Sequence, residues 1–330
     1  TWTVIDNTDG ERDIVRNNAG TWQYNSNGTY ASETWTNATT NTELAALAEA
    51  MEGASVGYNL ANGSFLQSFS IAAQATVPNH LAFNTDGTKM FVVDEAGRDV
   101  NEYTLSTGFD VSTSTFVDSF SVAGQDTNPM GLAFNSDGTK MFVVGDAGND
   151  VNEYTLSTGF DVSTASFVDS FSVSGQTSTP TGLAFNTDGT KMFVLSGTIG
   201  RSVLEYALTT GFDVSTASYV RLKSVSAQET APRGIAFNTD GTKMFIVGTS
   251  GDDVNEYSLS TGFDVSTASF VDSFSVSGQD TSPRGIAFNT NGTKMFIVGS
   301  ISDTVYQYTT ASYTNQMDKT QLDAVTDPNH

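Results

Sequence analysis

A segment of sixteen residues that occurs five times constrains the fold of this chain more than any other feature. In the copy that begins at Pro129 it reads Pro-Met-Gly-Leu-Ala-Phe-Asn-Ser-Asp-Gly-Thr-Lys-Met-Phe-Val-Val, and successive copies are 51 or 52 residues apart. Such a period indicates a repeat architecture, in which each repeat is one supersecondary unit and neighbouring repeats bury a shared core. The copies begin at Pro78, Pro129, Pro180, Pro232 and Pro283.

Each repeat contains four short apolar runs, which we interpret as four strands. An Asp-Gly turn follows the first run in four repeats, with Asn291 in place of Asp in the fifth, and Asp-Gly favours the positive backbone angles of a tight hairpin. The fourth run alternates apolar and polar residues with a period of two, as strands do. Four antiparallel strands in tandem predict a β-propeller, whereas the alternative, a β-solenoid, has shorter coils of parallel strands. In the second repeat the runs are Leu132–Asn135, Lys140–Val144, Val151–Leu156 and Phe167–Val173.

The fifth repeat lacks its fourth run, and a matching run precedes the first repeat. Phe65–Ile71 has the same apolar pattern as Phe167–Val173. We therefore expect this N-terminal strand to pair with Val305–Tyr308, complete the last blade and close the ring. The predicted fold is an all-β, five-bladed propeller of four-stranded blades over residues 65–310.

The hairpin of each blade, Phe-x-x-Asp-Gly-x-x-x-x-Val, resembles the propeller repeats of the YVTN and NHL type. The likeness covers about residues 65–310. It implies the propeller fold and is weak as a guide to function.

The chain outside the propeller predicts a small β-plus-helix module. Residues 1–53 contain a strand meander and a short helix, and residues 54–64 form a linker. Residues 311–330 form a C-terminal tail, which we expect to contain a helix and to pack with the module. If the ring closes as expected, both flanking segments emerge close together, and the module anchors the propeller or forms an oligomer. The expected elements are the strands Trp2–Ile5, Thr21–Tyr24 and Tyr30–Thr36 and the helices Thr42–Met51 and Gln316–Val325.

Both ends of the chain are similar to fibre or decoration proteins of tailed phages of marine bacteria. Thr1–Gly28 and Met317–Asp323 carry this resemblance. It implies a structural role in the virion and a homo-oligomer.

Composition excludes several classes of function. The formal charge of -23 disfavours nucleic acid and anionic membranes as partners. No apolar run is long enough for membrane insertion. The chain has no cysteine, and its two histidines, His80 and His330, exclude a histidine-based catalytic triad or a multi-histidine zinc site.

The repeated acidic residues have a structural interpretation and a metal interpretation. Asn-Thr-Asp-Gly at 84–87, 186–189 and 238–241 offers oxygen ligands for calcium but lacks the length of an EF-hand loop, so we favour a hairpin turn and no cofactor. The recurrent Asp110, Asp161, Asp213 and Asp264 are expected to accept backbone hydrogen bonds. The Asn-Glu-Tyr triplets at 101–103, 152–154 and 255–257 also suggest structural use. Because no asymmetric carboxylate pair stands out, we expect the chain not to be an enzyme.

One face of the predicted propeller varies between repeats and is the expected binding face. It carries the blade-crossing loops and the turns between second and third strands, and function on such scaffolds concentrates in loops. The alternative is drift in solvated loops. The candidate binding residues are Asn79, Arg98, Met130, Asn149, Arg201, Arg233, Asp252 and Arg284.

The third repeat differs in its outermost strand. Arg221 and Lys223 stand where the other repeats have aspartate and phenylalanine. We expect a lateral contact with a neighbouring subunit or module; the alternative is that these charges protect an exposed strand edge.

Three functions remain open. The preferred one is a non-enzymatic virion surface protein that is anchored to virion proteins through its termini and binds a host surface glycan or protein through its propeller. The second is a secreted, extracellular bacterial adhesin or lectin-like propeller. The third is a lactonase-like hydrolase with a metal in the channel. It needs non-repeating carboxylates where the inner strands begin. Small or apolar residues occur there instead, which disfavours this function.

Overall fold

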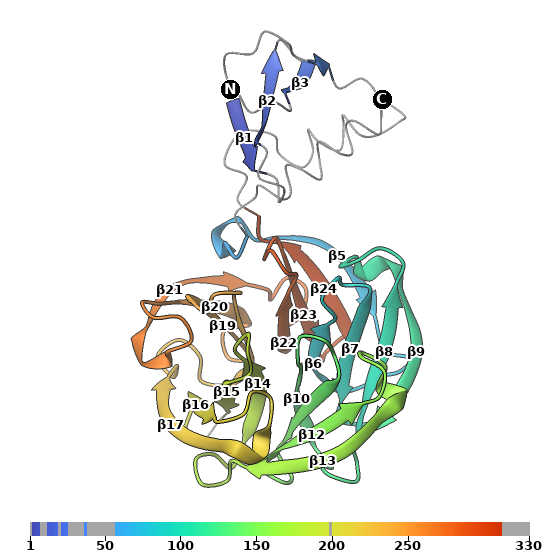
Figure 1. Ribbon diagram of the computed structural model, residues 1–330, viewed down its shortest axis with the longest axis vertical. Helices are drawn as coiled ribbons and strands as arrows, with labels where there is room; N and C mark the ends of the chain where they lie inside the picture. The colour runs from blue at the N-terminus through green and yellow to red at the C-terminus, as the bar shows by residue number, and fades with distance from the viewer. Residues whose placement is uncertain are drawn as a thin grey trace. The chain divides into compact units, whose positions relative to one another are not determined.

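Five four-stranded antiparallel sheets form a ring in the computed structural model of this chain (Figure 1). Each sheet is one blade, so the predicted five-bladed, all-β propeller is confirmed. The contacts divide the chain into two units, Leu60–Thr310, which holds the ring, and Thr1–Asn59 with Ala311–His330. The structure describes residues 2–6, 12–18, 21–25, 36–37, 57–197 and 200–311.

The strands of each blade follow one another in space in chain order, and the first strands contact each other around the ring axis. Blade 1 contains β6 (Pro78–Phe83), β7 (Lys89–Asp94), β8 (Asp99–Leu105) and β9 (Ser114–Ser121). Blade 2 contains β10 (Pro129–Phe134), β11 (Lys140–Gly145), β12 (Asp150–Leu156) and β13 (Ala165–Ser172). Blade 3 contains β14 (Pro180–Phe185), β15 (Lys191–Ser196), β16 (Ser202–Leu208) and β17 (Ala217–Ser224). Blade 4 contains β18 (Pro232–Phe237), β19 (Lys243–Gly248), β20 (Asp253–Leu259) and β21 (Ala268–Ser275).

Blade 5 is closed by a strand from the other end of the propeller. It contains β22 (Pro283–Phe288), β23 (Lys294–Gly299), β24 (Thr304–Thr309) and β5 (Ser64–Ser70). β5 pairs with β24 in antiparallel register, with Phe69 opposite Val305 and Phe65 opposite Tyr308. Figure 1 shows the blue β5 beside the red-brown β24. The predicted closure is therefore confirmed.

The first hairpin of each blade depends on its turn, which is Asp-Gly in blades 1 to 4 and Asn-Gly in blade 5. In blade 2, Asp137 accepts hydrogen bonds from the backbone N–H and the hydroxyl of Thr139. Gly138 has a φ of 71°, which side-chain-bearing residues rarely adopt, and the Phe160 ring fills the space that a Cβ would need. The turn therefore requires glycine both for its backbone angle and for packing.

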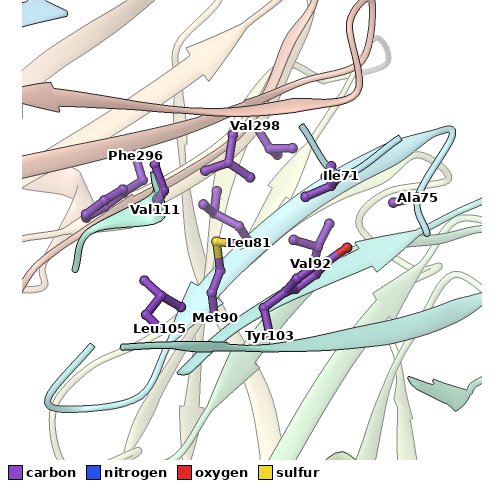
Figure 2. Close-up of a cluster of buried hydrophobic side chains, with 11 residues drawn as sticks. Ile71, Ala75, Leu81, Met90, Val92, Tyr103, Leu105, Val111, Phe296 and Val298 are labelled. Atoms are coloured by element: carbon purple, nitrogen blue, oxygen red, sulfur yellow. The ribbon is translucent and has the colours of Figure 1, made fainter. Parts of the chain in front are cut away.

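The hydrophobic core lies between neighbouring blades. In the cluster of Figure 2, Met90 and Tyr103 of blade 1 meet Phe296 and Val298 of blade 5. The second strands are buried on both faces, since each faces a blade on either side, which explains their continuous apolar runs. The fourth strands are largely exposed on the outer rim.

Short 3-10 helices lie between the third and fourth strands. Each is preceded by an aspartate whose side chain accepts a hydrogen bond from a backbone N–H inside the helix, as Asp110 does from Ser112. The expected role of Asp110, Asp161, Asp213 and Asp264 as backbone acceptors is thus confirmed. The helices are η1 (Leu60–Asn62), before β5, and η2 (Val111–Thr113), η3 (Val162–Thr164), η4 (Val214–Thr216) and η5 (Val265–Thr267).

Two recurring hydrogen bonds define the two faces of the ring. The Val122 N–H donates to the Arg98 carbonyl, so the crossing loop lies beside the turn between the second and third strands. The Phe109 N–H donates to the Gly87 carbonyl, so the connection between the third and fourth strands lies beside the first hairpin turn. We call these the crossing face and the turn face. The crossing face is the variable face of the sequence analysis.

A closed belt of hydrogen bonds runs around the turn face. The Thr85 hydroxyl donates to the Ser136 carbonyl at 3.2 Å, and each member binds the next blade in the same way until Thr290 donates to the Thr85 carbonyl at 3.0 Å. The belt therefore links every blade to both of its neighbours. Its members are Thr85, Ser136, Thr187, Thr239 and Thr290.

The other unit contains an antiparallel sheet of four strands in chain order. The expected helix at 42–51 and the segment at 316–325 lie outside the described residues, as does most of the expected strand at 30–36. One strand, β2, was missed, because its two apolar residues are adjacent and do not alternate with polar ones. The strands are β1 (Trp2–Asp6), β2 (Arg12–Asn18), β3 (Thr21–Asn25) and β4 (Thr36–Asn37). None of the described helices is long and apolar enough to span a membrane.

Candidate functional site

In every blade the residue after the first-strand proline is a β-bulge. In blade 2, Pro129 pairs with Gly145 and Gly131 pairs with Val144, so Met130 between them has no partner on β11. A bulge bends its strand and re-aims a side chain. The bulges lie where the inner strands begin, at the crossing face. We call the five bulged residues the mouth ring: Asn79, Met130, Thr181, Arg233 and Arg284.

Side chains of the mouth ring contact the next blade. Arg284 Nη1 donates to Asn79 Oδ1 at 3.0 Å, and Asn79 Nδ2 lies 3.3 Å from Met130 Sδ. Thr181 Oγ1 donates to the carbonyl of Pro232 at 3.0 Å. Asn79, Met130 and Thr181 are buried, whereas the two arginines are half-buried. The structure thus brings together four predicted binding residues and adds Thr181, which was not among the candidates.

The other four candidates occupy the turns between second and third strands. Their φ values lie between 46° and 55°, in the left-handed region, and each carbonyl accepts a hydrogen bond from the residue that follows the fourth strand. No hydrogen bond or ion pair among the described residues joins them to the mouth ring. These four are Arg98, Asn149, Arg201 and Asp252. Their predicted role in binding stays a prediction.

Arg233 and Arg284 form a cationic pair on neighbouring blades. Burial, and then the positive charge of Arg233, lower the pKa of Arg284. Arg233 Nε is buried without a hydrogen-bond partner. Within the described chain neither guanidinium has a carboxylate oxygen within 4.0 Å, although both belong to a chain of strongly negative charge.

Carboxylates surround the pair at a greater distance. Glu95 accepts a hydrogen bond from Asn79 Nδ2 at 3.3 Å, and its charge opposes the lowering of the Arg284 pKa. Burial, followed by the charges of Asp126 and Glu95, raises the pKa of Asp146, and Arg233 acts in the opposite direction. The mouth therefore combines cationic donors with carboxylate acceptors.

A hollow opens on the turn face. Its volume is about 260 Å³. Phe134, Phe185 and Phe237, the last residues of three inner strands, line it with belt members and with Phe212 and Phe263. This hollow was not predicted from the sequence, because the residues that line it repeat almost unchanged and the expected binding face was the variable one. The signal that could have revealed it is the phenylalanine that ends each first strand.

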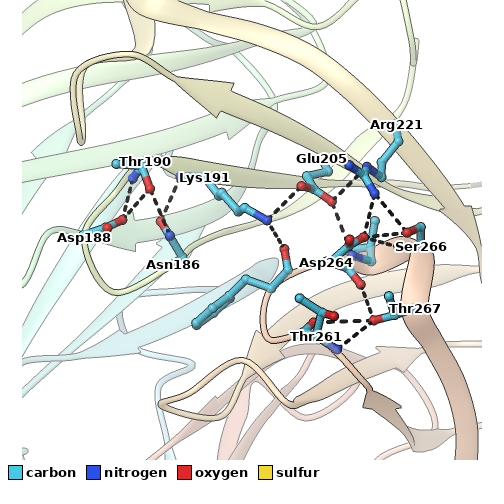
Figure 3. A network of polar contacts seen from close by, with 12 residues as sticks. Asn186, Asp188, Thr190, Lys191, Glu205, Arg221, Thr261, Asp264, Ser266 and Thr267 are labelled. Atoms are coloured by element: carbon cyan, nitrogen blue, oxygen red, sulfur yellow. Dashed lines mark hydrogen bonds and ion pairs between the residues drawn. The ribbon is translucent and has the colours of Figure 1, made fainter.

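The repeated glutamates join one blade to the next. In blade 3, Lys191 Nζ lies 3.1 Å from Glu205 Oε1 and donates to the carbonyl of Phe263 in blade 4 (Figure 3). Glu205 Oε2 accepts from the Val265 N–H, also in blade 4. We call this arrangement the lysine–glutamate clasp. It recurs with Glu102 and Glu153, which agrees with the structural use inferred from the triplets.

Arg221 and Lys223 also bridge blades 3 and 4. Arg221 Nη1 lies 2.8 Å from Asp264 Oδ1 and donates to Ser266 (Figure 3). Lys223 Nζ donates to the carbonyl of Ala268. Both side chains therefore have partners inside the chain. A lateral contact with another subunit through them stays a prediction.

The turn aspartates considered for calcium are used in hydrogen bonds. Asp86 accepts from the N–H and the hydroxyl of Thr88, and these bonds lower its pKa. Among the described residues, no three histidine or acidic side chains are grouped so that they could hold a metal ion.

Comparison with known proteins finds distant similarity to solved structures alone. No protein-family model matches the chain, and no curated protein matches it. A "putative 6-phosphogluconolactonase" from Bacteroides uniformis is 12% identical, with a TM-score of 0.47, over 96% of this chain and 83% of that chain. A luciferin-regenerating enzyme is 14% identical, with a TM-score of 0.46, over 74% and 95%. The β-propeller domain of Cps50 (Swd1) from Myceliophteria thermophila is 8% identical, with a TM-score of 0.42, over 75% and 99%.

The expectation that this chain is not an enzyme is wrong, because two of these neighbours are named as enzymes. At such identities the likeness extends to the fold alone. The expectation considered carboxylates where the inner strands begin and left out the carboxylates of other segments near the crossing face. Carboxylates that do not occur in every blade lie near the crossing-face mouth on other segments: Glu95 and Asp146 follow the second strands of blades 1 and 2, and Asp126 lies in a crossing loop.

Proposed function

We propose that this chain is a virion surface protein of a tailed phage, in which the terminal unit anchors and the propeller displays its crossing face to a host surface. The observation that supports this most is the position of the propeller's two ends. Ser64 and Thr309 are paired residues of one sheet, so the chain enters and leaves the ring at the same blade. The segments on either side belong to one unit. In this proposal the propeller is an insertion into that unit, as a displayed domain would be.

The binding part of the proposal depends on the mouth ring. The five bulges repeat in structure while carrying four different kinds of side chain, with arginine in both blades 4 and 5. A constant backbone that carries changing side chains is typical of a recognition surface on a rigid scaffold. The proposed partners are virion proteins for the terminal unit and a host glycan or protein for the propeller. We also propose a homo-oligomer, because the ends resemble phage fibre and decoration proteins.

The location of the protein tests this proposal. Purified virions, cell extract and secreted material are compared by quantitative mass spectrometry, with known capsid proteins as the positive control. We expect peptides of both units in intact particles, at a constant ratio to the capsid protein. Absence from particles together with abundance in the secreted fraction would contradict the proposal and favour an extracellular bacterial adhesin or lectin-like protein.

A further inference from the structure

We propose that the Arg233–Arg284 pair binds the anionic group of an acidic sugar. The inference rests on the proposed function in taking the crossing face as the binding surface. It adds the class of ligand and the residues that hold it.

The first argument is that the pair has unused hydrogen-bonding capacity. Arg284 donates to two neutral partners, Ser300 Oγ at 3.1 Å and Asn79 Oδ1 at 3.0 Å. Arg233 Nε is buried without a partner. A guanidinium carries five donors in a planar fork that fits carboxylate, sulfate or phosphate. A buried donor without a partner costs free energy, so a ligand oxygen at this position is favoured.

The second argument is the position of the pair. Arg233 and Arg284 are the bulges of β18 and β22, two inner strands that contact each other. The positive charge of Arg233 is near enough to contribute to the lowered pKa of Arg284, after burial. Two like charges held together in a half-buried position are stabilised by an anion between them. The corresponding residues of blades 1 to 3 are uncharged, so the ring offers one such position.

The third argument selects the ligand. Glu95 and Asp146 also influence the electrostatics of the mouth, and they would repel a ligand of high charge density. A sugar hydroxyl, by contrast, donates a hydrogen bond to a carboxylate. A ligand with one anionic group and several hydroxyls therefore satisfies both the arginines and the acids. An acidic sugar has this composition, whereas a polyanion conflicts with the charge of -23.

Binding of defined oligosaccharides to the purified full chain tests the inference. The probes are a neutral oligosaccharide that ends in a single galacturonate, its methyl ester of equal length, and an oligosaccharide of similar size with a single sulfate, measured by titration calorimetry at low and physiological salt. We expect the wild-type chain to bind an anionic probe about tenfold more tightly than the ester, since the ester lacks the charge-assisted hydrogen bonds. The carboxylated and sulfated probes distinguish which acidic group is preferred.

Matched variants separate the pair from general electrostatics. The double variant Arg233→Gln/Arg284→Gln is expected to lose about tenfold or more in affinity for the anionic probe and little for the ester. The control, Arg12→Gln/Arg16→Gln, removes the same charge from β2, outside the propeller, and should change affinity less than about twofold. Equal losses in both variants, no preference for the anionic probes, or no binding would each overturn the inference. Thermal melting of each variant verifies folding. Because the test needs no virion, its failure is distinguishable from failure of the virion proposal.

Discussion

At the scale of single residues, His80 is the exception in an otherwise constant position. The other four blades have glycine there, and a Cβ on Gly131 would lie 2.9 Å from the backbone nitrogen of Leu183 on the next inner strand. The inner strands therefore approach closely at this level. His80 is buried with both ring nitrogens unpartnered, and burial lowers its pKa to about 4.

This histidine predicts a pH-dependent loss of stability. In the unfolded chain His80 binds a proton near pH 6.5, whereas in the folded chain it does so near pH 4. The free energy of unfolding should therefore fall as pH decreases from about 6.5 to 4, by up to about 3 kcal/mol from this group, and no further below pH 4. His80→Gly, which follows the other blades, should remove that part of the slope. Urea unfolding of both proteins at pH 7.5, 5.5 and 4.5 measures it, and identical slopes would contradict the assignment.

At the scale of structural elements, the lysine–glutamate clasp connects the second and third strands of one blade to the loop of the next. Glu153 Oε1 lies 2.7 Å from Lys140 Nζ, and its Oε2 accepts from the Val214 N–H at 3.0 Å. In blade 5 a glutamine, Gln307, accepts from Val111 in the same way but cannot form an ion pair. Blade 5 therefore shows that the hydrogen bond can be kept without the charge.

The clasp predicts a graded series of stabilities. Glu153→Ala removes both interactions of a buried carboxylate and should lower the free energy of unfolding by about 2–3 kcal/mol. Glu153→Gln keeps the acceptor for Val214 and should cost about half as much. Asp169→Asn, an exposed change at the paired position on β13, should alter stability by less than about 0.5 kcal/mol. Equal effects of the alanine and glutamine variants in chemical denaturation would argue against the clasp.

Most elements of the propeller were predictable because all five repeats present the same alternation and a turn with glycine, which is Asp-Gly in four of them and Asn-Gly in the fifth. The closing strand was predictable because the apolar run that the fifth repeat lacks occurs before the first repeat. The bulges were not, since an extra residue in one strand leaves no trace in an alternation of apolar and polar residues. For that reason the sequence marks Arg233 and Arg284 as variable without showing that they meet. Strand β2 was not predicted because its two apolar residues are adjacent. The turn-face hollow was not predicted because the residues that line it repeat almost unchanged.

At the scale of the whole molecule, ring closure depends on β5. Without it, β24 would present an unpaired edge, which promotes aggregation. A chain that begins at Gly57 keeps β5 and should melt cooperatively as a monodisperse propeller. A chain that begins at Ala72 lacks β5 and should melt at a lower temperature or aggregate. Calorimetry with size-exclusion chromatography compares them; equal melting temperatures and equal elution would show that the strand does not close the ring.

The pairing of Ser64 with Thr309 also determines how the propeller responds to mechanical force. If the two connecting segments are pulled apart, the load acts on the outermost pair of the β5–β24 ladder, and the strands unzip one pair at a time. If both segments are pulled in the same direction, no component of the force separates the strands. A propeller tethered in this way resists drag as long as its two tethers share the load, and a cut in either tether leaves the other to carry the full tension at the edge of one sheet.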